Sequence, residues 1–142
     1  MAKKKKPKYN ENSQIRSAVR RTFSRSPLVQ GVLLAARSEH DKYNKDGRMS
    51  KKKAVRYTCA ECGKLFMKKH ASVDHISPVV CLSEGFIDWN TFITRLFCSK
   101  ENLQVLCSYK IKDIHLFNDT LSCHHIKSQK ERELRKANKA KL

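Results

Sequence analysis

Two cysteines separated by two residues, Cys59 and Cys62, carry the clearest chemical signal in the sequence. Gly63, which follows them, suits a tight turn that directs both sulfur atoms toward one point. A tetrahedral zinc ion needs four ligands, so this pair supplies half of a site. The candidates for the second half are Cys107 and Cys123, farther along the chain. The spacing therefore predicts a structural Zn²⁺ held by four thiolates.

Polar residues that can bind a metal ion or transfer a proton lie among these cysteines. Asp74 and His75 are adjacent, Asn102 comes later, and His124 directly follows the last of the four cysteines. Hydrolytic chemistry needs an activated water molecule and neutralisation of the charge that develops in the transition state. A histidine can activate the water, and a divalent ion can neutralise the charge. Each of these residues alone is also typical of a turn or a surface, so the inference depends on their combination.

In this order, and interleaved with cysteine pairs, these residues resemble those of an HNH endonuclease of the kind common in phage genomes. The resemblance covers most of residues 12–135 and is strongest at 57–78 and 95–107. It implies an α+β fold with a ββα-metal nuclease core, in which a β-hairpin carries the first histidine and a helix carries the last. Structural zinc knuckles would stabilise this core, and a basic helical hairpin would precede it.

The resemblance also implies a role for each polar residue. His75 matches the general base, and Asn102 matches the central residue that shapes the loop and orients that base. Asp74 and His124 match the two ligands of a catalytic ion, Mg²⁺ or Mn²⁺. Lys127 matches a position that is often basic and is a candidate phosphate contact. The implied activity is metal-dependent nicking or cleavage of double-stranded DNA.

One segment departs from the family pattern. Family members usually read Leu-Cys-x-x-Cys-His, whereas here residues 110–122 are inserted between Tyr109 and Cys123. Lengthening the loop between the two thiols from two residues to fifteen costs about 1.8 kcal/mol of closure entropy. Structural zinc contributes about 10–16 kcal/mol, so this cost alone does not abolish metal binding. We expect the long loop to lose the backbone N–H groups that support the sulfur atoms in a short knuckle.

The strong positive charge indicates a polyanionic partner. The 142 residues include 31 Lys and Arg against 13 Asp and Glu, for a formal net charge of +18. Nucleic acid binding by such a chain releases condensed counterions, so double-stranded DNA is the expected partner. An inert basic surface and attraction to anionic lipid are the alternatives.

The expected location is the cytoplasm, that of a bacterial host if a phage encodes the protein. No run approaches the ~18 apolar residues of a membrane span, so no membrane association is expected. In a reducing compartment, the six cysteines are metal ligands and core thiols rather than three disulfides.

Composition and turn signals divide the chain into five segments. They are a disordered basic arm (1–11), a basic helical hairpin broken at Ser26-Pro27 (12–40), a linker (41–53), the HNH nuclease domain with its insertion (54–135) and a basic tail (136–142). In the helical hairpin, Arg16, Arg20 and Arg21 are placed away from the apolar face, so we predict that they contact DNA. Packing of this segment against the nuclease domain is the alternative.

Two other functions stay open at this point. The chain can be a zinc-stabilised DNA-binding module, in which the insertion has displaced His124 from Asp74 and abolished catalysis. It can also be an accessory factor of a larger machine that packages phage DNA or spreads a mobile element. The complete set of Asp-His, Asn and His favours the enzyme, because a module that only binds DNA needs none of them.

Overall fold

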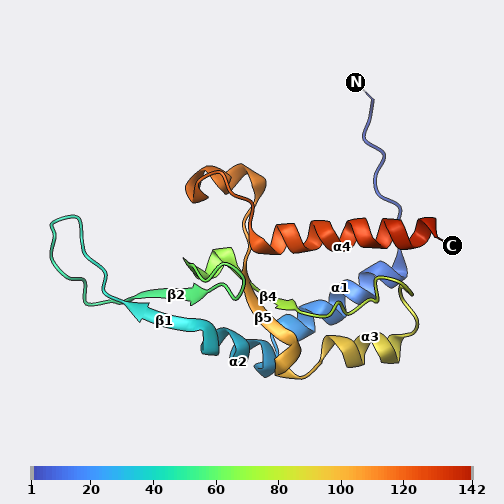
Figure 1. The fold of residues 1–142 in the computed structure, drawn as a ribbon, viewed down its shortest axis with the longest axis horizontal. Coiled ribbons are helices and arrows are strands. Elements are labelled where there is room, and N and C mark those ends of the chain that lie inside the picture. The colour runs from blue at the N-terminus through green and yellow to red at the C-terminus, as the bar shows by residue number, and fades with distance from the viewer. Residues whose placement is uncertain (1, 142) are drawn as a thin grey trace.

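The protein has an α+β architecture with two small antiparallel sheets (Figure 1). The computed structural model describes residues 2–141, so Met1 of the predicted arm and Leu142 of the predicted tail lie outside the described residues. The elements are α1 (Glu11–Ser24), α2 (Pro27–Ala36), β1 (Arg37–His40), β2 (Ala54–Thr58), β3 (Leu65–Phe66), β4 (Ala71–His75), α3 (Trp89–Leu96), β5 (Leu103–Cys107) and α4 (Cys123–Ala140). Within residues 2–141, no helix is both long enough and apolar enough to cross a membrane.

Side-chain caps fix where the first two helices begin. The Asn10 side chain accepts a 3.0 Å hydrogen bond from the backbone N–H of Ser13, so Asn10 caps α1. Ser26 caps α2 in the same way, and Pro27 occupies its first turn, where no backbone N–H is needed. The predicted break between the two helices is therefore present.

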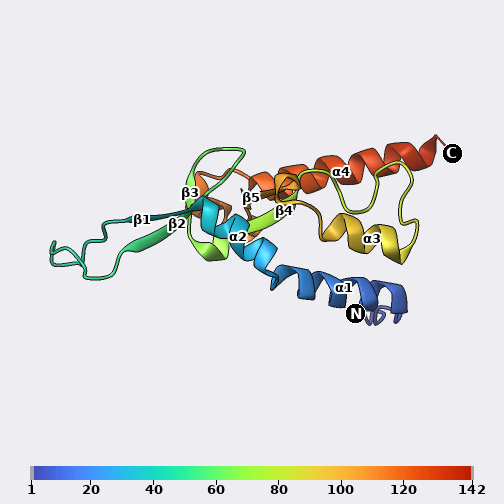
Figure 2. The same ribbon diagram turned by 90° about the horizontal axis from the view of Figure 1, so that it is seen from below.

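The segment after α2 differs from the sequence prediction, which gave helical structure up to residue 40 and a linker over 41–53. Residues 37–40 instead form β1, which pairs antiparallel with β2 so that Arg37 lies opposite Tyr57. Residues 41–53 are the loop of this β-hairpin, which extends away from the rest of the chain (Figures 1 and 2). The partner strand lies beyond a long polar loop, so local propensity alone does not reveal the pairing.

Strands β4 and β5 bring two distant polar segments together. They pair antiparallel, with Asp74 opposite Gln104. Helix α4 begins beside them and is capped by Ser122, whose hydroxyl accepts a 3.2 Å hydrogen bond from the backbone N–H of His125. The helix continues through Ala140, so residues 136–140 of the predicted tail are helical.

Two apolar clusters form the interior. The larger cluster joins α1, α2, α3 and β5 and consists of Phe23, Val29, Val79, Phe92, Leu96 and Leu103. The smaller cluster includes two of the cysteines and consists of Cys59, Phe66, Leu106 and Cys107. Both clusters contact β5, so this short strand connects the helical part of the molecule to the cysteines.

Replacement of Leu96 by alanine tests the larger cluster. Leu96 is 1% exposed, so Leu96→Ala leaves a cavity and should lower the free energy of unfolding by about 2–5 kcal/mol. Chemical denaturation of both proteins measures the difference. Leu34→Ala, at a side chain 68% exposed on α2, is the matched control and should change stability by less than about 0.5 kcal/mol. Equal decreases in the free energy of unfolding for the two variants would contradict this placement of the core.

Candidate metal centre and adjoining polar site

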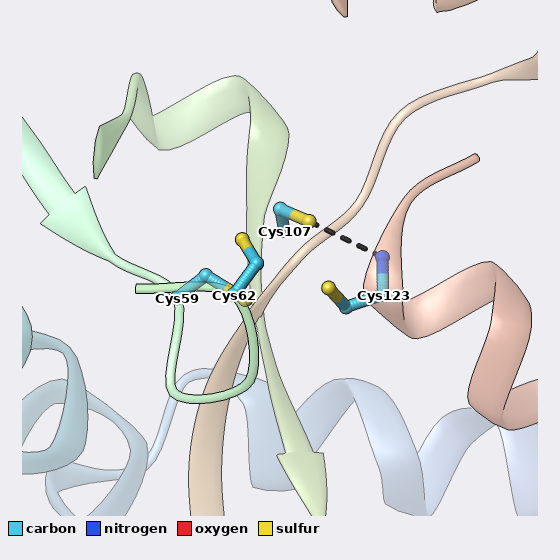
Figure 3. Close-up of side chains that lie close together, drawn as sticks. All are labelled: Cys59, Cys62, Cys107 and Cys123. Atoms are coloured by element: carbon cyan, nitrogen blue, oxygen red, sulfur yellow. Dashed lines mark hydrogen bonds between the residues drawn. The ribbon is translucent and has the colours of Figure 1, made fainter. Parts of the chain in front are cut away.

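Four cysteines from three parts of the chain converge on one small region (Figure 3). Cys59 and Cys62 lie between β2 and β3, Cys107 ends β5, and Cys123 begins α4. Their Sγ atoms all lie within 4.8 Å of one another. A zinc ion with Zn–S bonds of about 2.3 Å holds its sulfur ligands about 3.8 Å apart. The four thiols predicted as ligands therefore form a site that could hold a metal ion of this kind.

The insertion does not remove the backbone support of the sulfur atoms, contrary to the sequence expectation. The backbone N–H of Cys123 donates a 3.2 Å hydrogen bond to Sγ of Cys107 (Figure 3). In a short knuckle this bond comes from a tight turn, whereas here the first turn of α4 supplies it. The helix N-terminus thus replaces the turn, because its first N–H groups have no partner within the helix.

The inserted segment packs beside the cysteines as a compact element. Ile111–Phe117 forms a 3₁₀ helix. The Phe117 ring stacks on the Tyr109 ring with centroids 3.9 Å apart and contacts the Phe66 ring at 5.8 Å. The Tyr109 hydroxyl donates a 2.8 Å hydrogen bond to the carbonyl of Thr120. These contacts hold the two ends of the insertion together, so Cys107 and Cys123 stay close despite their separation in sequence.

Three of the clustered thiols have a shifted pKa. Burial disfavours the Cys59 thiolate, but hydrogen bonds from nearby backbone N–H groups, first that of Cys62, outweigh burial and lower its pKa to about 7. Burial and the negative charge of the neighbouring thiolates raise the pKa of Cys107 to about 11. Burial and the hydrogen bond with Cys107 also raise the pKa of Cys123. Ionisation of one thiol thus disfavours ionisation of its neighbours, and a divalent cation bound among them would remove that repulsion.

The other two cysteines lie outside this cluster. Cys81 hydrogen-bonds the Ser83 hydroxyl at 3.2 Å, and Cys98 is half-buried beside the larger apolar cluster. None of the six cysteines forms a disulfide in the part of the chain that the structure describes, which includes all of them. Among residues 2–141, the four-cysteine cluster is the one group of three or more metal-ligating side chains that lie close together.

Asp74 is the centre of a polar cluster next to the cysteines. Its Oδ1 lies 4.0 Å from Nε2 of His124, the residue that follows Cys123 on α4. Its Oδ2 accepts a 3.2 Å hydrogen bond from the Gln104 amide on β5. The Asp74 side chain is 13% exposed and that of His124 is 39% exposed, so solvent reaches the pair from the histidine side. The two predicted ligands of the catalytic ion thus lie together.

Lys127 faces into this cluster rather than outward. Its ammonium lies 3.2 Å from Asp74 Oδ2, donates a 2.9 Å hydrogen bond to the carbonyl of His75 and pairs with Glu131 one turn along α4. Burial disfavours the charged amine, but the contacts with Glu131 and Asp74 outweigh burial and raise the pKa of Lys127. The three N–H donors of the ammonium therefore all have acceptors within the protein. The phosphate contact predicted for Lys127 stays a prediction, and it requires one of these acceptors to be replaced by a phosphate oxygen.

His75 leaves β4 on the opposite face from Asp74, as neighbouring residues of a strand do. Its Nε2 lies 2.8 Å from the carbonyl oxygen of Leu96, and its ring packs 5.0 Å from the Phe23 ring. A carbonyl can only accept a hydrogen bond, so Nε2 carries the hydrogen and Nδ1 of the neutral ring keeps a lone pair. A cavity of about 340 Å³ adjoins the ring and includes Arg20 and Lys68 in its lining.

Asn102 fastens the loop that follows His75. Its side-chain oxygen accepts a 2.8 Å hydrogen bond from the Ser77 N–H, and its amide donates to the Ser77 carbonyl at 3.3 Å. The Asn102 carbonyl also accepts from the N–H of Ile76 at 2.8 Å. The chain leaving β4 is thus held on both sides of its backbone, which is the geometry expected of a residue that shapes the loop.

Two of the three arginines of α1 are placed differently from the sequence expectation. The Arg16 guanidinium lies 5.9 Å from the Phe86 ring centre, and that of Arg20 lies 5.5 Å from the Phe92 ring centre on α3. Partial burial lowers the pKa of Arg20, and the like charge of Arg16 lowers it further. Arg21 is exposed. Two of the three arginines therefore lie on the side of α1 that faces α3, and their contact with DNA stays a prediction.

Sequence reasoning missed two members of the polar cluster. Gln104 reaches Asp74 only because the β4–β5 register places them opposite each other. A polar residue between the apolar residues of Leu103–Cys107 was the available signal for an inward-facing amide. The pairing of Glu131 with Lys127 could have been predicted, because residues four apart on a helix are neighbours on its surface.

Comparison of the chain with models of known protein families, with curated proteins and with solved structures gives no match. The function is therefore argued from the residues and their geometry.

Replacement of Cys59 by serine tests the metal centre. Structural zinc contributes about 10–16 kcal/mol in small domains, so loss of one thiolate should unfold the domain or lower its melting temperature markedly. Metal content by mass spectrometry and thermal unfolding measure the effect. Cys81→Ser, which removes a thiol outside the cluster, is the control and should keep one bound zinc per chain. Unchanged zinc content in the Cys59→Ser variant would exclude the proposed ligands.

Proposed function

We propose that this protein is a metal-dependent HNH endonuclease that nicks or cleaves double-stranded DNA. One observation carries the proposal more than any other. The strand residue Asp74 and the helix residue His124, far apart in sequence, approach to 4.0 Å, and His124 directly follows Cys123 of the four-cysteine cluster. Because Cys123 and His124 are neighbours in the chain, the metal centre that fixes one also fixes the other.

The donor atoms of this pair suit a divalent cation. Two metal–ligand bonds of about 2.1 Å allow a separation of up to about 4.2 Å between the donor atoms, and the observed 4.0 Å lies within that limit. Asp74 and His124 would hold Mg²⁺ or Mn²⁺, which when bound supplies Lewis-acid stabilisation of negative charge on the phosphate. The carboxylate oxygen that faces His124 is not the one that Gln104 and Lys127 engage.

In this proposal His75 accepts the proton of the attacking water. Its hydrogen bond to the Leu96 carbonyl orients the ring and leaves the Nδ1 lone pair as the basic atom. Asn102 fixes the following loop through Ser77 and so limits the movement of His75 relative to Asp74. Hydrogen bonds to backbone groups thus fix the orientation of the His75 ring and the position of the Asn102 side chain.

We also propose Zn²⁺ as the ion of the four-cysteine cluster and duplex DNA as the partner. Four thiolates in a tetrahedral arrangement are typical of structural zinc. A net charge of +18 supports a polyanionic partner, and the free thiols fit the reducing cytoplasm.

A non-catalytic DNA-binding module is the second candidate, and two observations favour it. Lys127 already pairs with Asp74, so an ammonium group neutralises the carboxylate that the catalytic ion needs. The His75 ring packs against Phe23 on the other face of β4. The sequence suggested that the insertion displaces His124 from Asp74 in such a module. The structure gives no support for that displacement, because His124 lies 4.0 Å from Asp74.

Cleavage of supercoiled plasmid separates the two functions. We expect nicking by the purified protein with Mg²⁺ or Mn²⁺, and a rate at least about 100-fold lower for His75→Ala, because general bases typically contribute that much or more. Gel electrophoresis over time gives the rates.

His115→Ala is the matched control, because His115 is an exposed histidine in the insertion. It should nick at the rate of the parent protein. Nicking by His75→Ala at an undiminished rate would remove His75 from the role of base. A parent protein that binds duplex DNA but does not nick it with either ion would favour the binding module.

A further inference from the structure

The β-hairpin that extends away from the body has an ordered tip. We call residues 37–58, which comprise β1, its loop and β2, the β1–β2 arm. Within the loop, Tyr43 and Met49 form an antiparallel bridge, and the N–H of Asn44 donates a 2.8 Å hydrogen bond to the carbonyl of Arg48. Gly47, with φ of 83°, completes the turn. The segment that the sequence presented as a linker is thus a folded projection.

The arm carries a large excess of unpaired positive charge. Its loop contains two acidic residues, and both are engaged: Asp41 pairs with Lys53, and Asp46 accepts a hydrogen bond from the backbone N–H of Arg48. Five further cationic side chains are exposed and form no ion pair within residues 2–141, and these are Lys42, Lys45, Arg48, Lys51 and Lys52. Like charges on one thin projection repel each other unless a polyanion lies against them.

The fold itself gives this loop no packing role. No residue of 41–53 is buried, and none belongs to either apolar cluster. Tyr43 is 62% exposed and Met49 is 58% exposed, so the bridge at the tip presents apolar surface between the lysines. An ordered, charged projection without a core is typical of a surface that contacts a partner.

The base of the arm is fastened to the metal centre. Strand β2 pairs with β3, and Thr58 at its end is followed directly by Cys59. With a rise of about 3.3 Å per residue, a hairpin of this length reaches roughly 20–25 Å beyond its strands, which is less than one helical turn of DNA. Phosphates at that distance lie on the same duplex as the one contacted by the body of the protein.

We propose that the β1–β2 arm is a second DNA contact that binds the sugar-phosphate backbone of the substrate duplex away from the cleavage site. This inference rests on the proposed nuclease function for the identity of the duplex. The arm sets affinity and the length of DNA covered, and it takes no part in the chemical step.

Replacement of the five unpaired cations by glutamine tests the proposal. Both the arm variant and its parent carry His75→Ala, so that bound DNA stays intact. Fluorescence anisotropy with a labelled duplex of about three helical turns gives the dissociation constant at several salt concentrations. We expect binding at least about tenfold weaker in moderate salt, and a salt dependence of log K reduced by about 2 or more, since each phosphate contact contributes about 0.9.

A control variant removes the same charge from the N-terminal segment through Lys3→Gln, Lys4→Gln, Lys5→Gln, Lys6→Gln and Lys8→Gln. A smaller loss of DNA affinity for this control than for the arm variant supports a specific contact by the arm. Equal losses for the two variants, or an arm variant that binds as tightly as its parent, would overturn the arm as a contact while leaving the nuclease proposal standing. A parent that binds no duplex at all would overturn both.

Discussion

Four sulfur atoms that must share one small volume hold the candidate site together. The clustered thiols come from the β2–β3 turn, the end of β5 and the start of α4, so one bound ion would join three separate parts of the chain. The apolar core near them is small, with four buried residues, two of which are the cysteines Cys59 and Cys107. Small cores of this kind commonly depend on a metal for stability. Binding of the ion and the position of His124, which follows Cys123, are thereby coupled.

The polar cluster beside the metal centre engages the two oxygens of Asp74 differently. Asp74 has one oxygen engaged by Gln104 and Lys127 and another that faces His124. The Lys127 ammonium and the Gln104 amide both contact Oδ2 of Asp74 and hold the carboxylate in place. A divalent ion on the His124 side would add to this arrangement rather than replace it.

Much of the site was readable from the sequence, because its parts are local signals. The Cys59 and Cys62 pair, the adjacent Asp74 and His75, and the adjacent Cys123 and His124 each appear within a few residues. The pairing of Arg37–His40 with β2 was not readable, since the two strands are joined by a long polar loop without strand character. The Gln104 contact and the packing of Arg16 and Arg20 on aromatic rings depend on register and helix rotation, which tertiary contacts decide. The hydrogen bond from the Cys123 N–H to the Cys107 sulfur was likewise not predictable, because it depends on the path that the insertion takes.

Zinc-edge X-ray absorption spectroscopy of the purified protein tests the central claim most directly, because every other part of the site depends on the four thiolates. The account predicts one zinc per chain with four sulfur neighbours at about 2.3 Å. A spectrum dominated by nitrogen or oxygen neighbours, or a folded protein without bound metal, would contradict it.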